Sequence, residues 1–401
     1  MGPSRSICPA PVGAARLRRI GPGLIVAAGM LAAPLASNAQ GLRLRFPKFD
    51  ELGPGNSTVR ALLFTPDGKT LITAGLYDPV LRLWDVEKAE VRAALPGHND
   101  HPLSLALSPD GKILAAAGRY EEAARLWDIA TGKLRATIPG HHHFWGNALS
   151  FAPDGKTLAM AMKGGNVRFF DAESGRPGLI LPEAIDPVAF APDGKTLATG
   201  STDGDTKLWD VATRRTTARL ASGGMVHSFI FSADGSSLVT YTSGKGTVEA
   251  RLWDPATGKR WPDFQPPQKR ISAMALAPDG KRFATGDFDH VEVTIWDVAT
   301  GAAKVVLRGL AEHVRALAFS PDGTTLAAGC GDTFKPLEIG LWDVSTGRLL
   351  TIERSPNERD PAIAVTSLAY SPDGRLLAAG HHHGVVRFYD LGGIRKAEAT
   401  P

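Results

Sequence analysis

The 401-residue sequence predicts an all-β fold, a β-propeller of eight four-stranded antiparallel blades, and three observations predict it. A Pro-Asp-Gly triplet recurs along the chain, with Ala233-Asp234-Gly235 as a degenerate copy. An aromatic-Asp pair begins 17 to 21 residues after the start of each triplet. Apolar runs of strand length lie beside both markers. Two independent markers that stay in phase eight times identify an internal repeat.

The repeat length is that of one propeller blade, because successive triplets begin 39 to 51 residues apart. The intact triplets begin at Pro66, Pro109, Pro153, Pro192, Pro278, Pro321 and Pro372. The aromatic-Asp pairs are Trp84-Asp85, Trp127-Asp128, Phe170-Asp171, Trp209-Asp210, Trp253-Asp254, Trp296-Asp297, Trp342-Asp343 and Tyr389-Asp390.

Each unit predicts four strands in a fixed order. An apolar run such as 314–319 comes first, and its short length favours a strand over a helix. The triplet then turns the chain, since Pro fixes φ and Gly accepts a positive φ. A second strand such as 196–200 follows, and a third such as 80–84 ends in the aromatic-Asp pair. A polar turn leads to an outer strand such as 134–138.

The Trp-Asp pairs, Gly97-His98, Gly140-His141 and the Ser-Pro-Asp-Gly turns together resemble the WD40-repeat family. The resemblance covers about residues 56–391, almost the whole chain after its first segment. It implies a propeller fold and a role as an interaction scaffold without catalysis. Because one fold hosts many functions, the resemblance specifies the fold much more than the function.

In the resembled family a loop His, a strand Ser or Thr, an Asp and the Trp often form a buried hydrogen-bonded tetrad. In this sequence the set of four residues is incomplete. One repeat has His98 and Trp127 but Ala116 where the hydroxyl belongs, and another has His313 with Ala328. No copy is complete, so apolar packing is expected to carry more of the stability. The six Trp-Asp pairs are predicted to be structural.

The two ends of the chain are expected to close the ring. The eighth repeat ends at Asp390 after three strands, and residues 42–46 alternate with period two. The N-terminal segment can therefore supply the missing outer strand and leave no open edge. The alternative is seven blades plus an appended hairpin. The propeller is expected to span residues 40–391, followed by a flexible tail at 392–401.

Residues 1–39 have the pattern of a secretory signal peptide. This segment holds four arginines and no acid, then an apolar run at 24–33, then small residues at Ser37 and Ala39. The run is short for a membrane span, although an uncleaved anchor is the alternative. The protein is expected to be exported to a bacterial periplasm or secreted.

The net charge of +4 belongs to this leader. Without residues 1–39 the chain has 41 basic and 41 acidic residues. No concentrated basic stripe remains, which argues against a nucleic-acid partner. Cys330 is the one cysteine after the leader, so an internal disulfide is excluded.

The predicted binding surface is one face of the ring. Loops alternate between faces in a four-stranded antiparallel blade. The Pro-Asp-Gly turns define the bottom face, and the variable loops define the top face, where insertions suggest binding. We expect a protein or peptide partner there and no cofactor. The candidate top-face residues are His98, His101, Arg119, His141, His142, His143, Phe144, Trp145, His290, Asp332, Arg359, His381, His382 and His383. The polar run 119–122 is expected to be a solvated loop.

A metal site is a weaker hypothesis, because short His tracts are only compositional evidence. It would use His141, His143, His381 and His383. The two His triplets belong to blades three positions apart on the ring, which argues against joint coordination.

The alternative function is a propeller enzyme or a propeller that binds a small ligand or metal, lactonase-like or lyase-like, with side chains that converge over the central channel. The candidates would be Asp287, Asp289, His290 and Asp332. No sequence motif of a hydrolase, zinc protease or nucleotide-binding loop supports this alternative.

Overall fold

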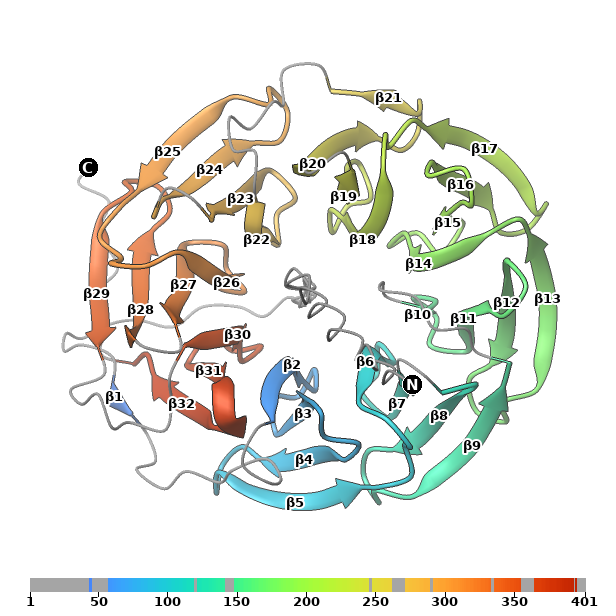
Figure 1. Ribbon diagram of the computed structural model, residues 1–401, viewed down its shortest axis with the longest axis horizontal. Helices are drawn as coiled ribbons and strands as arrows, with labels where there is room; N and C mark the ends of the chain where they lie inside the picture. The colour runs from blue at the N-terminus through green and yellow to red at the C-terminus, as the bar shows by residue number, and fades with distance from the viewer. Residues whose placement is uncertain are drawn as a thin grey trace, which may run out of the picture.

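The computed structural model is a closed ring of eight sheets, each with four antiparallel strands (Figure 1). It describes residues 43–44, 57–118, 121–140, 148–244, 247–261, 271–288, 291–332, 335–354, 364–392 and 394. The predicted fold class and the count of eight blades are confirmed. The alternative of seven blades plus an appended hairpin is wrong, because every repeat forms its own sheet. The predicted leader lies outside the described residues.

Each blade places its strands in chain order from the centre of the ring outward, except in the last blade (Figure 1). The innermost strands of blades 1 to 8 are β2 (Thr58–Phe64), β6 (Pro102–Leu107), β10 (Leu149–Phe151), β14 (Ile185–Phe190), β18 (Met225–Phe231), β22 (Ile271–Leu276), β26 (Val314–Phe319) and β30 (Val365–Tyr370). The second strands are β3 (Thr70–Leu76), β7 (Ile113–Gly118), β11 (Thr157–Met162), β15 (Thr196–Gly200), β19 (Leu238–Gly244), β23 (Arg282–Asp287), β27 (Thr325–Asp332) and β31 (Leu376–His381).

The third strands end in the aromatic-Asp pairs. They are β4 (Leu81–Asp85), β8 (Ala123–Asp128), β12 (Asn166–Asp171), β16 (Thr206–Asp210), β20 (Thr247–Asp254), β24 (Val293–Asp297), β28 (Lys335–Asp343) and β32 (Val386–Asp390). The outer strands are β5 (Glu90–Leu95), β9 (Leu134–Pro139), β13 (Pro177–Pro182), β17 (Arg215–Leu220), β21 (Lys259–Arg260), β25 (Ala303–Leu307), β29 (Leu349–Arg354) and, in blade 8, β1 (Arg43–Leu44). A short 3-10 turn, η1 (His382–Gly384), joins β31 to β32.

The outer strand of blade 8 comes from the other end of the chain. β1 pairs antiparallel with β32, with Arg43 opposite Asp390 and Leu44 opposite Tyr389. Only these two residues of the expected closing segment 42–46 lie among the described residues. β1 lies beside β32 on the outside of the ring (Figure 1).

The bottom turns follow the chemistry predicted for the Pro-Asp-Gly triplet. In blade 2, Ser108 Oγ donates to Asp110 at 2.7 Å, and Gly111 has a φ of 73°. Most other residues are strained at such a φ, so glycine is favoured there. The same turns also contact each other around the ring. A Cβ added to Gly68 in blade 1 would lie 3.4 Å from Pro372 Cδ in blade 8. The turns of the first and last repeats are therefore in contact.

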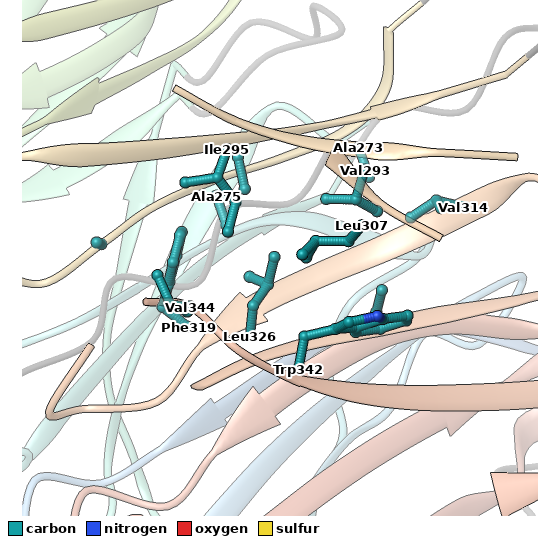
Figure 2. Packing of buried hydrophobic residues seen from close by; sticks show 13 residues of the cluster. Ala273, Ala275, Val293, Ile295, Leu307, Val314, Phe319, Leu326, Trp342 and Val344 are labelled. Atoms are coloured by element: carbon teal, nitrogen blue, oxygen red, sulfur yellow. The ribbon is translucent and has the colours of Figure 1, made fainter. Parts of the chain in front are cut away.

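The core is divided among the interfaces between neighbouring blades. Figure 2 shows one such cluster, in which Val293 and Ile295 of blade 6 lie opposite Leu326 and Trp342 of blade 7. Each of these four side chains is at most 1% exposed. A blade is therefore stabilised by its two neighbours, and the closed ring gives every blade two of them.

The tryptophans of the Trp-Asp pairs are anchored inside this core. Trp209 and Trp296 donate through Nε1 to Thr199 and Thr285 at 2.9 and 2.8 Å. In the same way, Trp84 donates to the Thr73 hydroxyl and Trp253 donates to the Thr240 hydroxyl, each at 3.0 Å. The indole–hydroxyl pair is therefore present in four blades among the described residues.

We expect Gly380→Ala to lower the free energy of unfolding by about 1–3 kcal/mol, as overpacking of a tight contact does. Gly380 of β31 faces Val59 of blade 1, and an added Cβ would overlap Val59 and Ser367. Chemical denaturation followed by circular dichroism measures the change. Gly392→Ala in the tail is the control, and an equal loss in both variants would contradict a specific contact between blades 8 and 1.

Candidate functional site

Seven of the eight inner strands have a β-bulge near the top face. The register with the second strand shifts between Val59 and Ala61 in blade 1 and between Val314 and Ala316 in blade 7. Comparable shifts occur in blades 2, 4, 5, 6 and 8. A bulge leaves one residue out of the ladder and redirects its side chain. In blades 1 and 7 that residue is Arg60 and Arg315.

Bulge residues of four consecutive blades line one cavity at the top of the ring. Arg60, Ser272, Arg315 and Thr366 come from blades 1, 6, 7 and 8, and the cavity volume is about 120 Å³. Apolar side chains of the same inner strands form its floor, namely Leu62, Met274, Leu317 and Leu368. The cavity lies toward the top face because the inner strands start there.

Two histidines complete the wall of this cavity. His313 precedes β26, and His382 belongs to η1 in blade 8. Nδ1 of His382 is hydrogen-bonded to Thr58 Oγ1 at 2.9 Å, which ties η1 to blade 1. We call the cavity walled by Arg60, His313, Arg315 and His382 the basic pocket. No acidic residue is among its described lining residues.

The two guanidinium groups are held differently. Arg315 donates through Nε to the carbonyl of Gly331 at 2.7 Å, which fixes the direction of its side chain. Within the part of the chain that the structure describes, Nε of Arg60 has no hydrogen-bond partner. Burial is the main cause that lowers the pKa of Arg60. Tyr77 raises this pKa, and the nearby positive charge of Arg315 lowers it. Arg60 nevertheless stays charged at neutral pH, because a guanidinium begins from a very high pKa.

Tyr77 is an exposed aromatic residue at the edge of the basic pocket. Its side chain is 72% exposed, and its neighbour Leu76 lines the pocket. Its φ is 67°, a left-handed conformation that is unusual for a bulky residue. The Tyr77 ring centroid lies 5.6 Å from that of His101, which supports the loop from blade 2. Such strain is stored preferentially at functional sites.

The comparisons with known proteins address the fold and the repeat. The family model for the WD domain, G-beta repeat, matches residues 50–85, 89–128, 188–210, 304–334 and 359–390. These matches fall mainly on blades 1, 2, 4, 7 and 8 of the ring. The chain is an eight-bladed β-propeller with WD40 repeats at five positions. Proteins of this kind are typically interaction scaffolds.

A solved structure is similar to this WD40 propeller over most of its length. The crystal structure of the computationally designed Ika8 protein matches with a TM-score of 0.68 and 22% sequence identity. The match covers 85% of this chain and 99% of that one. At this identity the likeness shows the fold alone. No curated protein matches the chain.

The structure covers several histidines that the sequence placed in binding loops of the WD40 propeller. His98, His101 and His381 are at most 6% exposed, so their side chains do not reach the top surface. His382 lies in the basic pocket, and His383 follows it in η1 with a φ of 62°. The remaining candidates lie outside the described residues, namely Arg119, His141, His142, His143, Phe144, Trp145, His290 and Arg359. The side chain of Asp332 is also outside them.

The interpretation of 119–122 as a solvated loop is wrong for Glu121. Its side chain is 3% exposed and accepts hydrogen bonds from Arg125 Nη1 at 2.9 and 3.0 Å. It also contacts His98 Nδ1 and accepts from the backbone N–H of Asn99. Glu121 was missed because two of its partners, His98 and Asn99, lie in a different loop, 22 to 23 residues earlier in the chain.

The metal and enzyme hypotheses gain no support from the residues that can be placed. Among the described residues, no three His, Cys, Asp or Glu side chains are arranged to hold a metal ion. His141 and His143 lie outside them, so the four-histidine set is not assembled by the structure. Of the enzyme candidates, Asp287 is 3% exposed, and Asp289 and His290 fall outside the described residues.

Sequence reasoning missed the basic pocket and Tyr77. A usable signal was present, because the tripeptide Val-Arg-Ala occurs at 59–61 and again at 314–316, at the same point of two repeats. An arginine repeated at the start of an inner strand marks a shared position facing the ring centre. Nothing in the sequence indicates the left-handed backbone of Tyr77.

Proposed function

We propose that this WD40 propeller is an exported, non-enzymatic scaffold that binds a protein or peptide on its top face. The observation that carries the proposal is Tyr77, an exposed aromatic in a strained backbone conformation beside the basic pocket. Tyrosine and arginine are enriched among the residues that dominate the energy of protein interfaces. The bottom face instead repeats one turn in blade after blade, with its polar groups bonded within each turn.

Export is the second part of this proposal and rests on the sequence of residues 1–39. A basic start, an apolar run and small residues before position 40 support a cleaved leader. No helix among the described residues is long and apolar enough to cross a membrane. The partner is therefore sought in an envelope extract rather than in a whole-cell lysate.

We expect Tyr77→Ser to abolish capture of the partner, because Tyr77 is the most exposed large apolar side chain among the described residues. Tagged full-length protein is incubated with envelope extract, and the bound proteins are quantified by mass spectrometry. Leu134→Ser is the matched control, since Leu134 is 51% exposed at the bottom of blade 2. If the partner is lost with Leu134→Ser and retained with Tyr77→Ser, the interface lies on the bottom face, and the proposal is contradicted.

A further inference from the structure

We propose that β13, the outer strand of blade 3, pairs antiparallel with β13 of a second copy of this chain about a two-fold axis. This inference goes beyond the proposed function and does not depend on it, because Tyr77 belongs to blade 1. It follows from the composition of β13, from its exposed side chains and from the symmetry of its register.

The composition of β13 is the first argument. β13 is the last strand of its sheet, at the outside of the ring, and no described strand pairs with its outer edge (Figure 1). Such an edge presents unpaired backbone N–H and C=O groups, which natural proteins commonly protect with charged side chains. The sequence of β13, Pro-Gly-Leu-Ile-Leu-Pro, has no charged residue. Each of the other outer strands has at least one, including Arg43, Arg92, Arg135, Arg215, Lys259, Lys304 and Arg354.

The exposed side chains of β13 are the second argument. Leu179 is 50% exposed and Ile180 is 46% exposed, although both are large and apolar. Their neighbour Leu181 is instead fully buried in the contact between blades 3 and 4. A second molecule that covers Leu179 and Ile180 removes apolar area from water, which favours association.

The register of β13 is the third argument, and it identifies a second copy as the occupant of the edge. β13 contains a bulge, in which Gly178 and Leu179 together lie opposite one residue of β12. The six residues of β13 therefore fill five positions of the ladder, and Ile180 occupies the middle one. A copy related by a two-fold axis at Ile180 places Pro177 opposite Pro182. Contacts across a two-fold axis are self-complementary and are the commonest contacts in homo-oligomers.

The residues that flank β13 are complementary in charge under this symmetry. Arg176 precedes the strand and Glu183 follows it, so the axis brings Arg176 of each copy to Glu183 of the other. Arg176 is exposed and forms no ion pair within the described part of the chain. The Glu183 side chain is 83% exposed, and it contacts Lys207 Nζ at 3.2 Å. Two Arg–Glu contacts in each dimer would fix the register of the strand pair.

The prolines at the two ends of β13 limit this pairing to a dimer. Because Pro has no N–H, Pro177 and Pro182 restrict the new ladder to the four residues between them. Pairing also covers the outer edge of both β13 strands, so no edge is left for a third copy. Such a short ladder buries little area, and we expect a dimer that dissociates on dilution.

The test measures self-association of the full-length protein by sedimentation velocity at increasing concentration. We expect a reversible equilibrium between monomer and dimer. Leu179→Lys and Ile180→Lys should each raise the dimer dissociation constant at least tenfold, because they place like charges close to the two-fold axis. Val306→Lys is the matched control, since Val306 is 40% exposed on the outer strand of blade 6.

Charge reversal tests the register. Arg176→Glu should weaken the dimer at least threefold, because it places two carboxylates together. Combining it with Glu183→Arg should recover part of that loss. Hydrogen–deuterium exchange of the β13 amides should also become slower as the protein concentration rises.

Several results would overturn the inference. A protein that stays monomeric at every concentration has no such interface, and a dimer that resists both lysine variants uses another surface. Equal weakening by Val306→Lys would indicate general adhesion of exposed apolar side chains. If the β13 amides gain protection only when envelope extract is added, the edge binds a different protein and not a second copy. Circular dichroism melting confirms that each variant is folded, and the charge-reversal pair remains as the test if a lysine variant is unstable.

Discussion

Replacing Trp84 by alanine is expected to lower the free energy of unfolding by about 3–5 kcal/mol. Trp84 is 2% exposed and donates a hydrogen bond to Thr73 at 3.0 Å. Its ring meets that of Phe388 edge-on at 6.5 Å between centroids, across the contact between blades 1 and 8. The truncation leaves a cavity where the first and last blades of the ring meet. Denaturant unfolding followed by far-UV circular dichroism measures the loss.

Two further variants separate the parts of this effect. Trp84→Phe keeps most of the ring volume but removes the bond to Thr73, so we expect a smaller loss of about 1–3 kcal/mol. Tyr77→Ala removes an exposed ring from the same blade and should change stability little. A loss below about 1 kcal/mol for Trp84→Ala would mean that the contact between blades 1 and 8 contributes little to the free energy of unfolding. That result would contradict the view that closure of the ring stabilises the fold.

The architecture was predictable because it is repeated in local sequence chemistry. The triplet specifies a turn through Pro and Gly, and the aromatic-Asp pair specifies the end of the third strand. Both signals act within a few residues, so eight copies reinforce one another. The contact between the ends of the ring was predictable only as a requirement of closure. The structure adds the packing of Gly68 on Pro372 and of Trp84 on Phe388 to that expectation.

The site was not predictable to the same degree, because it depends on irregularities within the repeats. A bulge adds one unpaired residue to a strand, and an apolar run such as 314–319 does not reveal it. Arg315 therefore looks like the solvent-facing member of an alternating strand. Histidines, by contrast, were conspicuous in the sequence and were assigned to the surface. Three of them are buried, and one of these, His98, contacts Glu121 from a distant segment of the chain.

Glu121 joins three donors in blade 2, and its removal is the second large effect that we expect. The carboxylate lies between the His98 ring, the Asn99 N–H and the Arg125 guanidinium. The His98 ring in turn packs on Trp127 at 5.2 Å between centroids. Burial lowers the pKa of His98 despite the carboxylate beside it, which favours the neutral ring, and Nδ1 of that ring contacts Glu121.

Glu121→Ala should therefore lower the free energy of unfolding by about 3–5 kcal/mol, because the partly buried charge of Arg125 loses its partner. The same measurement on Glu122→Ala is the matched control. Glu122 pairs with Lys163 at 2.7 Å on the exposed surface, where an ion pair contributes only about 0–1 kcal/mol. Adding Arg125→Met to Glu121→Met should recover part of the loss, since removing both buried charges leaves neither uncompensated. If Glu121→Ala and Glu122→Ala lower the free energy of unfolding equally, the burial of Glu121 does not determine its contribution to stability.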